Sequence, residues 1–242
     1  MIGEGWGACD PENPKNRRLR PSILVEHGAT RLLVDTSPDL RQQLLSAAVD
    51  RLDAVLYTHA HADHLHGIDD LRALNRSMKA DIPAYADAET WRQIEERFGY
   101  VMSPLKPGVT FYYKPVLQKN VIAAGDRFKI GGIEIETFDQ DHGYSRTLGF
   151  RFGEIAYSTD VVNMPEESFA ALAGIDTWLV DALVDYDHPT HAHVDKIIDW
   201  TKRLNPRRTI LTHLSHRLDY AILAGQLPEG MEPAFDGMVI EV

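Results

Sequence analysis

Four histidine and aspartate side chains gather within six residues, directly after a short apolar run, in the segment YTHAHADHLHG at residues 57–67. Residues 52–57 are apolar enough to form a buried strand, and apolar side chains recur at near-helical spacing from residue 68 onward. The cluster therefore sits on a loop between a strand and a helix, which is where proteins commonly build functional sites. Imidazole and carboxylate groups are the ligands of borderline divalent metals, and an ordinary polar loop seldom collects them at this density. We expect a metal site with the ligands His59, His61, Asp63 and His64.

The order of these side chains indicates two metal ions. His59 and His61 are able to point one way from an extended segment, while Asp63 and His64 are able to point another way. A fifth polar residue, His66, is expected to cap the helix or to support a ligand instead of binding a metal ion.

The motif His-x-His-x-Asp-His at residues 59–64 resembles that of the metallo-β-lactamase superfamily. In that family a further His, a bridging Asp and a final His each follow a later strand. This chain has His142, Asp160 and His213, and each follows an apolar, strand-like stretch. The resemblance implies two metal ions, one held by His59, His61 and His142, the other held by Asp63, His64 and His213, with Asp160 as the bridge.

Strand-like and helical stretches are mixed along the whole chain, which predicts an α/β (α+β) protein. A chain of 242 residues is long enough for one large core, so we expect a single domain over residues 1–242. The resemblance implies a four-layer αβ/βα sandwich, from which a usual first strand is missing at the N-terminus. The expected strands are 23–26, 31–35, 52–57, 82–85, 127–130, 133–137, 147–152, 155–158, 177–182, 208–212 and 238–242. The expected helices are one that Ser37 caps, with Pro38 in its first position, then 68–78, 89–98, 165–173, 194–204 and one that His216 opens, with loops at 1–20, 101–115 and 226–233.

The chain is acidic, with a formal net charge of −11 and a pI of about 5.4. This charge argues against broad electrostatic binding of extended nucleic acid or of an anionic membrane surface. No apolar run approaches the length needed to span a bilayer. The single cysteine, Cys9, excludes an intrachain disulfide and, together with the absence of a signal-like start, predicts a cytoplasmic location. The expected partner is a small phosphorylated substrate, with a nucleotide as one option, and the sequence also allows a homodimer.

A second histidine cluster covers residues 187–193, in the sequence DHPTHAH. In the related phosphodiesterases and tRNA 3′-processing ribonucleases, a His in this region is thought to protonate the leaving group. By that resemblance His191 is the expected general acid, His188 is the alternative acid or a substrate contact, and His193 lies on a helix surface. Asp63 is expected to act in catalysis as well as in metal binding.

The N-terminal segment Asp10 to Arg18 resembles the phosphodiesterase branch of the superfamily, which includes the cyclic phosphoribosyl phosphodiesterase of phosphonate breakdown. Its basic residues are expected to be solvated, with a phosphate contact as the alternative; they are Lys15, Arg17, Arg18 and the nearby Arg20. Other branches fit less well. Redox di-iron relatives carry Glu where this chain has His61, and many true β-lactamases carry Cys where it has Asp160.

The expected activity is hydrolysis of a small phosphodiester, such as a cyclic nucleotide or a cyclic ribosyl phosphate. Two zinc or manganese ions lower the pKa of a shared water and direct the resulting hydroxide at phosphorus. One alternative is a metal-dependent thioester or lactone hydrolase, and another is a nucleotide-binding protein that keeps the metals without turnover. The chain has neither a G-x-S-x-G elbow nor a Walker loop, so neither serine-hydrolase nor NTPase chemistry is indicated.

Overall fold

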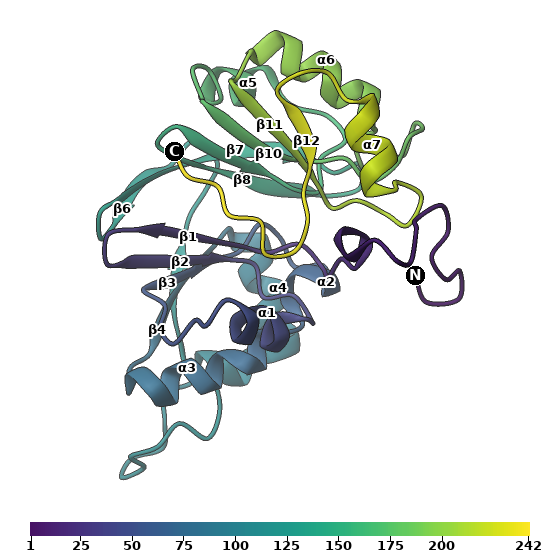
Figure 1. Cartoon of the computed structure of the whole chain (residues 1–242). Helices are drawn as coiled ribbons and strands as arrows, with labels where there is room; N and C mark the ends of the chain where they lie inside the picture. Colours follow the sequence, from purple (N-terminus) through teal and green to yellow (C-terminus); the bar gives the residue numbers. More distant parts are fainter. The chain divides into compact units, whose positions relative to one another are not determined.

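The computed structural model describes residues 1–242 (Figure 1). By internal contacts the chain divides into two compact units. Unit 2 is Arg20–Glu134, and unit 1 combines Met1–Leu19 with Ile135–Val242. None of the helices has the length and apolar character that a membrane-spanning segment needs.

Unit 2 is built on a five-stranded sheet in the order β1-β2-β3-β4-β5. Strands β1 and β2 form an antiparallel hairpin, while β2 to β5 run parallel to one another. The strands are β1 (Ile23–His27), β2 (Thr30–Val34), β3 (Ala54–Leu56), β4 (Ile82–Ala86) and β5 (Leu117–Val121), and β6 (Arg127–Ile130) follows in the chain. The helices are α1 (Leu40–Ser46), α2 (Ala62–Leu65), η2 (Ile68–Asp70), α3 (Leu71–Met78), α4 (Ala88–Phe98) and η3 (Gly99–Met102).

The core of unit 2 forms where α1, α3 and α4 lie together on one side of its sheet (Figure 1). Alternate residues of β4, Ile82 and Ala84, point to this core, as the period of a strand requires. Trp91 and Ile94 meet them from α4, because residues three apart share one face of a helix. These side chains are fully buried, and they anchor the helices against the sheet.

Unit 1 carries all but the first two residues of β7 (Ile133–Asp141). Its other strands are β8 (Arg146–Phe152), β9 (Ile155–Ser158), β10 (Thr177–Asp181), β11 (Arg208–Thr212) and β12 (Met231–Pro233). Strands β7, β8 and β9 form an antiparallel meander, whereas β9 to β12 are parallel neighbours. The helices are η1 (Pro14–Asn16), α5 (Glu166–Ala171), α6 (Val194–Leu204) and α7 (Tyr220–Gln226). Figure 1 shows α5, α6 and α7 on one side of these strands. There Phe169, Ile197 and Leu223 pack with Trp178 and Leu211 of the sheet.

Most of the predicted elements are present. The hairpin at β1 and β2, helix α6 and strand β11 have the expected positions, and the bounds of α6 and β11 agree to the residue. Strand β5 was missed, because its sequence LQKNV has only one fully buried apolar residue, Leu117, to reveal the pattern.

Three expected boundaries are wrong. Helix α1 begins at Leu40 and not at Pro38, because the Ser37 carbonyl accepts a hydrogen bond from Leu40 N in a turn that precedes the helix. His216 does not open a helix; α7 starts at Tyr220, where the Asp219 carboxylate accepts hydrogen bonds from the first helical N–H groups. Residues 238–242 form no strand, and the last strand is β12 inside the expected loop at 226–233.

Candidate metal centre

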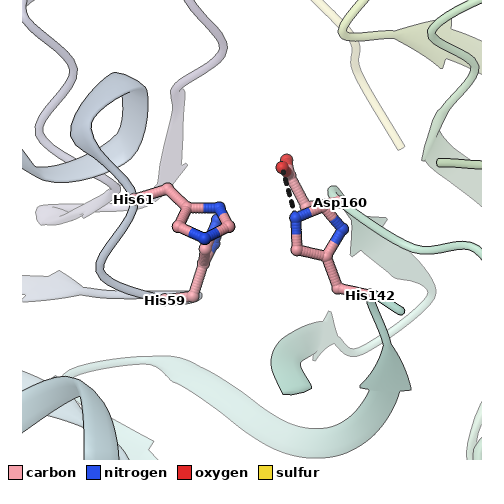
Figure 2. Close-up of side chains that lie close together, drawn as sticks. All are labelled: His59, His61, His142 and Asp160. Atoms are coloured by element: carbon pink, nitrogen blue, oxygen red, sulfur yellow. Dashed lines mark ion pairs between the residues drawn. The ribbon is translucent and has the colours of Figure 1, made fainter. Parts of the chain in front are cut away.

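The histidine motif lies at the carboxyl end of β3 in unit 2. His59 is in the loop, His61 occupies the N-cap position of α2, and Asp63 and His64 lie within the short helix α2 itself. The ring centroids of His59 and His61 are 4.5 Å apart, and those of His59 and His64 are 4.4 Å apart. Figure 2 shows the rings of His59 and His61 beside each other. Unit 2 thus brings its predicted ligands together.

Asp35, at the end of β2, orients two of these imidazoles. Its buried carboxylate accepts hydrogen bonds from Nδ1 of His64 and from Oγ1 of Thr58, both at 2.8 Å. Since the Thr58 hydroxyl donates to Asp35, it accepts from Nδ1 of His59 at 3.0 Å. Both rings therefore carry their proton on Nδ1, and Nε2 is the nitrogen suited to a metal ion. Burial raises the pKa of Asp35, while the hydrogen bonds from His64 and Thr58 oppose that rise.

The contact between Asp35 and His64 depends on a close approach of two backbone segments at Gly67. Thr36 N donates to the His64 carbonyl at 2.8 Å, and Gly67 N donates to the Thr36 carbonyl at 2.9 Å. A Cβ atom on Gly67 would lie 1.9 Å from the Ser37 carbonyl oxygen. Only glycine fits here, and it allows the segment after β2 to lie against α2, so that Asp35 reaches His64.

Unit 1 brings the other three predicted ligands to the carboxyl ends of its strands. His142 follows β7, Asp160 lies two residues after β9, and His213 follows β11. One Asp160 oxygen is 3.5 Å from Nε2 of His142, the ion pair drawn in Figure 2, and the other is 3.7 Å from Nε2 of His213. The single carboxylate therefore faces two imidazoles, as a bridging ligand would.

Three site residues adopt left-handed backbone conformations, which side chains other than glycine rarely adopt. The φ angles are +64° at Asp35, +53° at Asp160 and +58° at His213. Each residue comes directly or almost directly after a strand, where the turn aims its side chain back over the end of the sheet. Such conformations cost free energy and are concentrated at functional sites.

His191 lies beside the ligands of unit 1. Its Nδ1 atom is hydrogen-bonded to the buried Asp181 carboxylate at 2.7 Å, and its ring stacks on that of His213 at 5.0 Å. One ligand atom from each of Asp160, His191 and His213 lies within 4.8 Å of the other two. His191 thus lies where it can either donate a proton to a substrate or bind a metal ion. Sequence reasoning missed Asp181, although an acidic residue at the end of the otherwise apolar strand β10 is a signal that points to it.

The loop that carries His191 also supports His142. The Thr190 carbonyl accepts a hydrogen bond from Nδ1 of His142 at 2.7 Å. His188 lies in the same loop, with its ring 5.3 Å from that of His191, and burial followed by the charge of His191 lowers its pKa. His193 is half-buried at the N-cap position of α6, where it pairs with the exposed Asp187 at 3.3 Å.

Two of the four basic residues near the N-terminus, Lys15 and Arg18, stabilise the fold of unit 1. Arg18 donates from Nη2 to the carbonyls of Ser215 and Leu218, in the loop that follows His213. The Lys15 ammonium lies 4.3 Å from the centroids of the Tyr220 and Phe235 rings. The expectation that Lys15 and Arg18 are solvated is wrong, because both are drawn inward by carbonyl groups and aromatic faces. Arg17 is exposed, and in unit 2 Arg20 pairs with Asp39.

The donor set fits a divalent metal ion. It combines imidazoles with carboxylates, and His59, His64 and His142 each engage Nδ1 with a second protein group. Such outer partners are usual for metal-binding histidines, and this mixed nitrogen and oxygen set suits zinc or manganese.

Residues 30–214 match the family model described as "Beta-lactamase superfamily domain". The chain belongs to the metallo-β-lactamase superfamily. The expected superfamily and its α/β fold class are confirmed. The structure of a diphosphatase from the PhnP family is similar, with 33% identity and a TM-score of 0.87 over 96% of this chain and 87% of that one.

Two curated relatives extend this comparison. An octanoyltransferase of Porphyromonas gingivalis is 32% identical over 98% of this chain and 48% of its own length. A ribonuclease Z of Bradyrhizobium diazoefficiens is 30% identical over 57% of this chain and 46% of its own length. The chain therefore spans at most about half the length of these two relatives.

Proposed function

We propose that this protein hydrolyses a small phosphodiester with the help of two divalent metal ions. The observation that carries the proposal is the position of Asp160, whose two oxygens face His142 and His213. In the proposed centre His59, His61 and His142 would hold one ion, Asp63, His64 and His213 would hold the other, and Asp160 would be shared by both.

The ligands of this centre come from both units of the chain. The family model spans residues 30–214 and so includes most of unit 2 together with the ligand-bearing strands of unit 1. This supports the proposal that the two units form one catalytic domain.

The bound metal ions, Asp181 and His191 have separate roles in the proposed reaction. When bound, the metal ions lower the pKa of a water molecule towards neutrality and neutralise charge on the phosphoryl oxygens. Asp181 accepts the Nδ1 hydrogen of His191 and so directs Nε2 towards the space beside Asp160. There protonated His191 donates its Nε2 proton to the ester oxygen that leaves as an alcohol.

The similar proteins support chemistry at phosphorus. A diphosphatase, similar in structure, and a ribonuclease, similar in sequence, both cleave bonds to phosphorus. The net charge of −11 favours a small substrate over extended nucleic acid. The octanoyltransferase name favours acyl chemistry, the class of the thioester alternative, and this chain spans about half of that protein, as it does of the ribonuclease. The diphosphatase, of which 87% is covered, therefore gives the stronger support for chemistry at phosphorus.

The test is turnover of bis(p-nitrophenyl) phosphate by the purified protein, after chelation and then after addition of manganese or zinc, with bound metal counted in parallel. We expect loss of turnover on chelation, recovery on metal addition, and about two ions per chain. Turnover of thioesters or lactones without turnover of the phosphodiester would favour the acyl hydrolase. Nucleotide binding with two bound ions and no turnover of any ester would favour the non-catalytic alternative.

A further inference from the structure

A row of side chains in unit 1 leads from the candidate metal ligands to an exposed aromatic ring. The His191 and His188 rings are 5.3 Å apart, and the His188 and Tyr186 rings are 6.5 Å apart. The Arg217 guanidinium lies over the Tyr186 ring, 5.2 Å from its centroid. The row thus begins beside the proposed general acid and ends on a planar surface.

This end of the row lies where open sheets bind ligands. Tyr186 and His188 are in the loop after β10, and Arg217 is in the loop after β11. Ligands of α/β sheets bind beyond the carboxyl ends of parallel strands, and β10 and β11 are parallel neighbours.

The side chains of Tyr186 and Arg217 are not needed for the hydrophobic core. Tyr186 is 48% exposed, and the Arg217 side chain is 52% exposed. The one ion pair of Arg217, from Nε to Asp185 at 3.4 Å, is exposed on both sides and so contributes little to stability. Arg217 covers one part of the Tyr186 ring, and the remaining exposed surface is open to a second planar group.

We propose that Tyr186, held by Arg217, stacks against the nucleobase of a nucleotide whose phosphodiester is cleaved beside His191. The inference rests on the proposed function and names its substrate class as nucleoside-bearing phosphodiesters. Aromatic side chains stack on bases through their π faces, and a neighbouring guanidinium adds a cation–π contribution. Because the Arg217 guanidinium lies over the Tyr186 ring, this residue acts as a positioning residue for the ring.

The test compares two esters that release the same p-nitrophenolate, the p-nitrophenyl ester of thymidine 5′-monophosphate and methyl p-nitrophenyl phosphate. For Tyr186→Leu we expect KM for the nucleoside ester to rise about tenfold with kcat little changed, and the kinetics of the methyl ester to stay the same. Tyr186→Phe keeps the ring and the low KM, whereas Arg217→Ala gives a smaller rise for the nucleoside ester alone. Calorimetry with thymidine 5′-monophosphate should show the same loss of affinity in Tyr186→Leu.

Arg207→Ala is the matched control. Arg207 precedes β11, as Arg217 follows it, and it likewise pairs with an aspartate, Asp176. This variant should leave the kinetics of both esters unchanged.

The outcomes separate the stacking role from the proposed hydrolysis. Equal effects of Tyr186→Leu on both esters, or equal KM values for both esters in the unaltered protein, would overturn the stacking role while hydrolysis stands. If neither ester is hydrolysed but nucleotide binding depends on Tyr186, the hydrolysis fails and the stacking surface stands. Absence of both turnover and nucleotide binding overturns both.

Discussion

The carboxylate of Asp181 accepts a hydrogen bond from Nδ1 of His191 at 2.7 Å, and its other oxygen lies 3.5 Å from Nδ1 of His213. One buried acid at the end of β10 therefore orients the proposed general acid and also faces a candidate metal ligand. Asp181 ends β10, and β10 lies between its parallel neighbours β9 and β11. The carboxylate is therefore placed beside the loop that carries His191 and the loop that carries His213.

Replacing this acid should slow the reaction. In Asp181→Asn the charge that stabilises protonated His191 is lost, so we expect a fall in kcat of about 10- to 100-fold on a phosphodiester with an alcohol leaving group, such as a cyclic nucleotide. Asp176→Asn is the control, since Asp176 precedes the same strand and pairs with Arg207. Equal activity of the two variants would remove Asp181 from the mechanism.

Asp35 should matter for metal affinity. Asp35→Asn removes the carboxylate that holds His64 directly and His59 through Thr58, and affinity should fall about 10- to 100-fold. Competition with a chromogenic chelator measures this change. Asp50→Asn is the control because Asp50 is largely exposed and pairs with Arg31 on the surface of the same unit. Unchanged affinity in Asp35→Asn would contradict the proposed orienting role.

The three histidines His59, His191 and His66 should behave differently when replaced by alanine. His59→Ala is expected to lose a metal ion and most activity, whereas His191→Ala is expected to keep both ions and slow turnover. His66→Ala should change neither, because His66 is exposed and packs edge-on against Phe98 at 5.4 Å. The number of bound metal ions and the turnover rate are measured for all three variants. Loss of an ion in His191→Ala would instead make it a ligand, which its position beside Asp160 allows.

Gly67→Ala should destabilise the protein by about 3 kcal/mol, because the new methyl group collides with the Ser37 carbonyl and the backbone has to move. Metal affinity should fall with it, since the same approach brings Asp35 to His64. Urea unfolding measures the free-energy change. Gly99→Ala is the control: no atom lies within 4 Å of the added group, so stability should change by less than about 0.5 kcal/mol.

Asp219→Ala should lower the free energy of unfolding by about 1 to 2 kcal/mol at pH 7, because the carboxylate caps α7. A hydrogen bond from Asp10 N, followed by one from Ile222 N, lowers the pKa of Asp219. A folded pKa below the unfolded value of about 4 means that the stabilisation is complete above that value and is lost as the pH falls through the folded pKa.

Urea unfolding between pH 7 and pH 3 tests this relation. The gap between the unaltered protein and Asp219→Ala should be constant near neutrality and should narrow below about pH 4. Asp195→Ala is the control, since Asp195 is an exposed residue in the first turn of α6 and does not occupy its N-cap position. A gap that stays the same at low pH would show that the charge of Asp219 contributes nothing.

Several features could be predicted from local sequence because their causes are local. The spacing of His59 to His64 on a strand-to-helix connection needs only the neighbouring apolar residues to place it. Helix α6 has an apolar face in its own sequence and ends before Pro206, so its limits could be stated to the residue. The expected order of the later ligands, by contrast, came from a family resemblance.

The tertiary structure decided what depends on strands pairing across long stretches of sequence. Asp35 reaches His64 because β2 and β3 run parallel and Gly67 lets the backbone approach. Asp181 reaches His191 because the loop after β10 returns across the end of its own strand. The three-residue strand β12 exists only because β11 offers it a partner. Such contacts depend on hydrogen bonding and close packing between distant segments, and neither leaves a periodic pattern in the sequence.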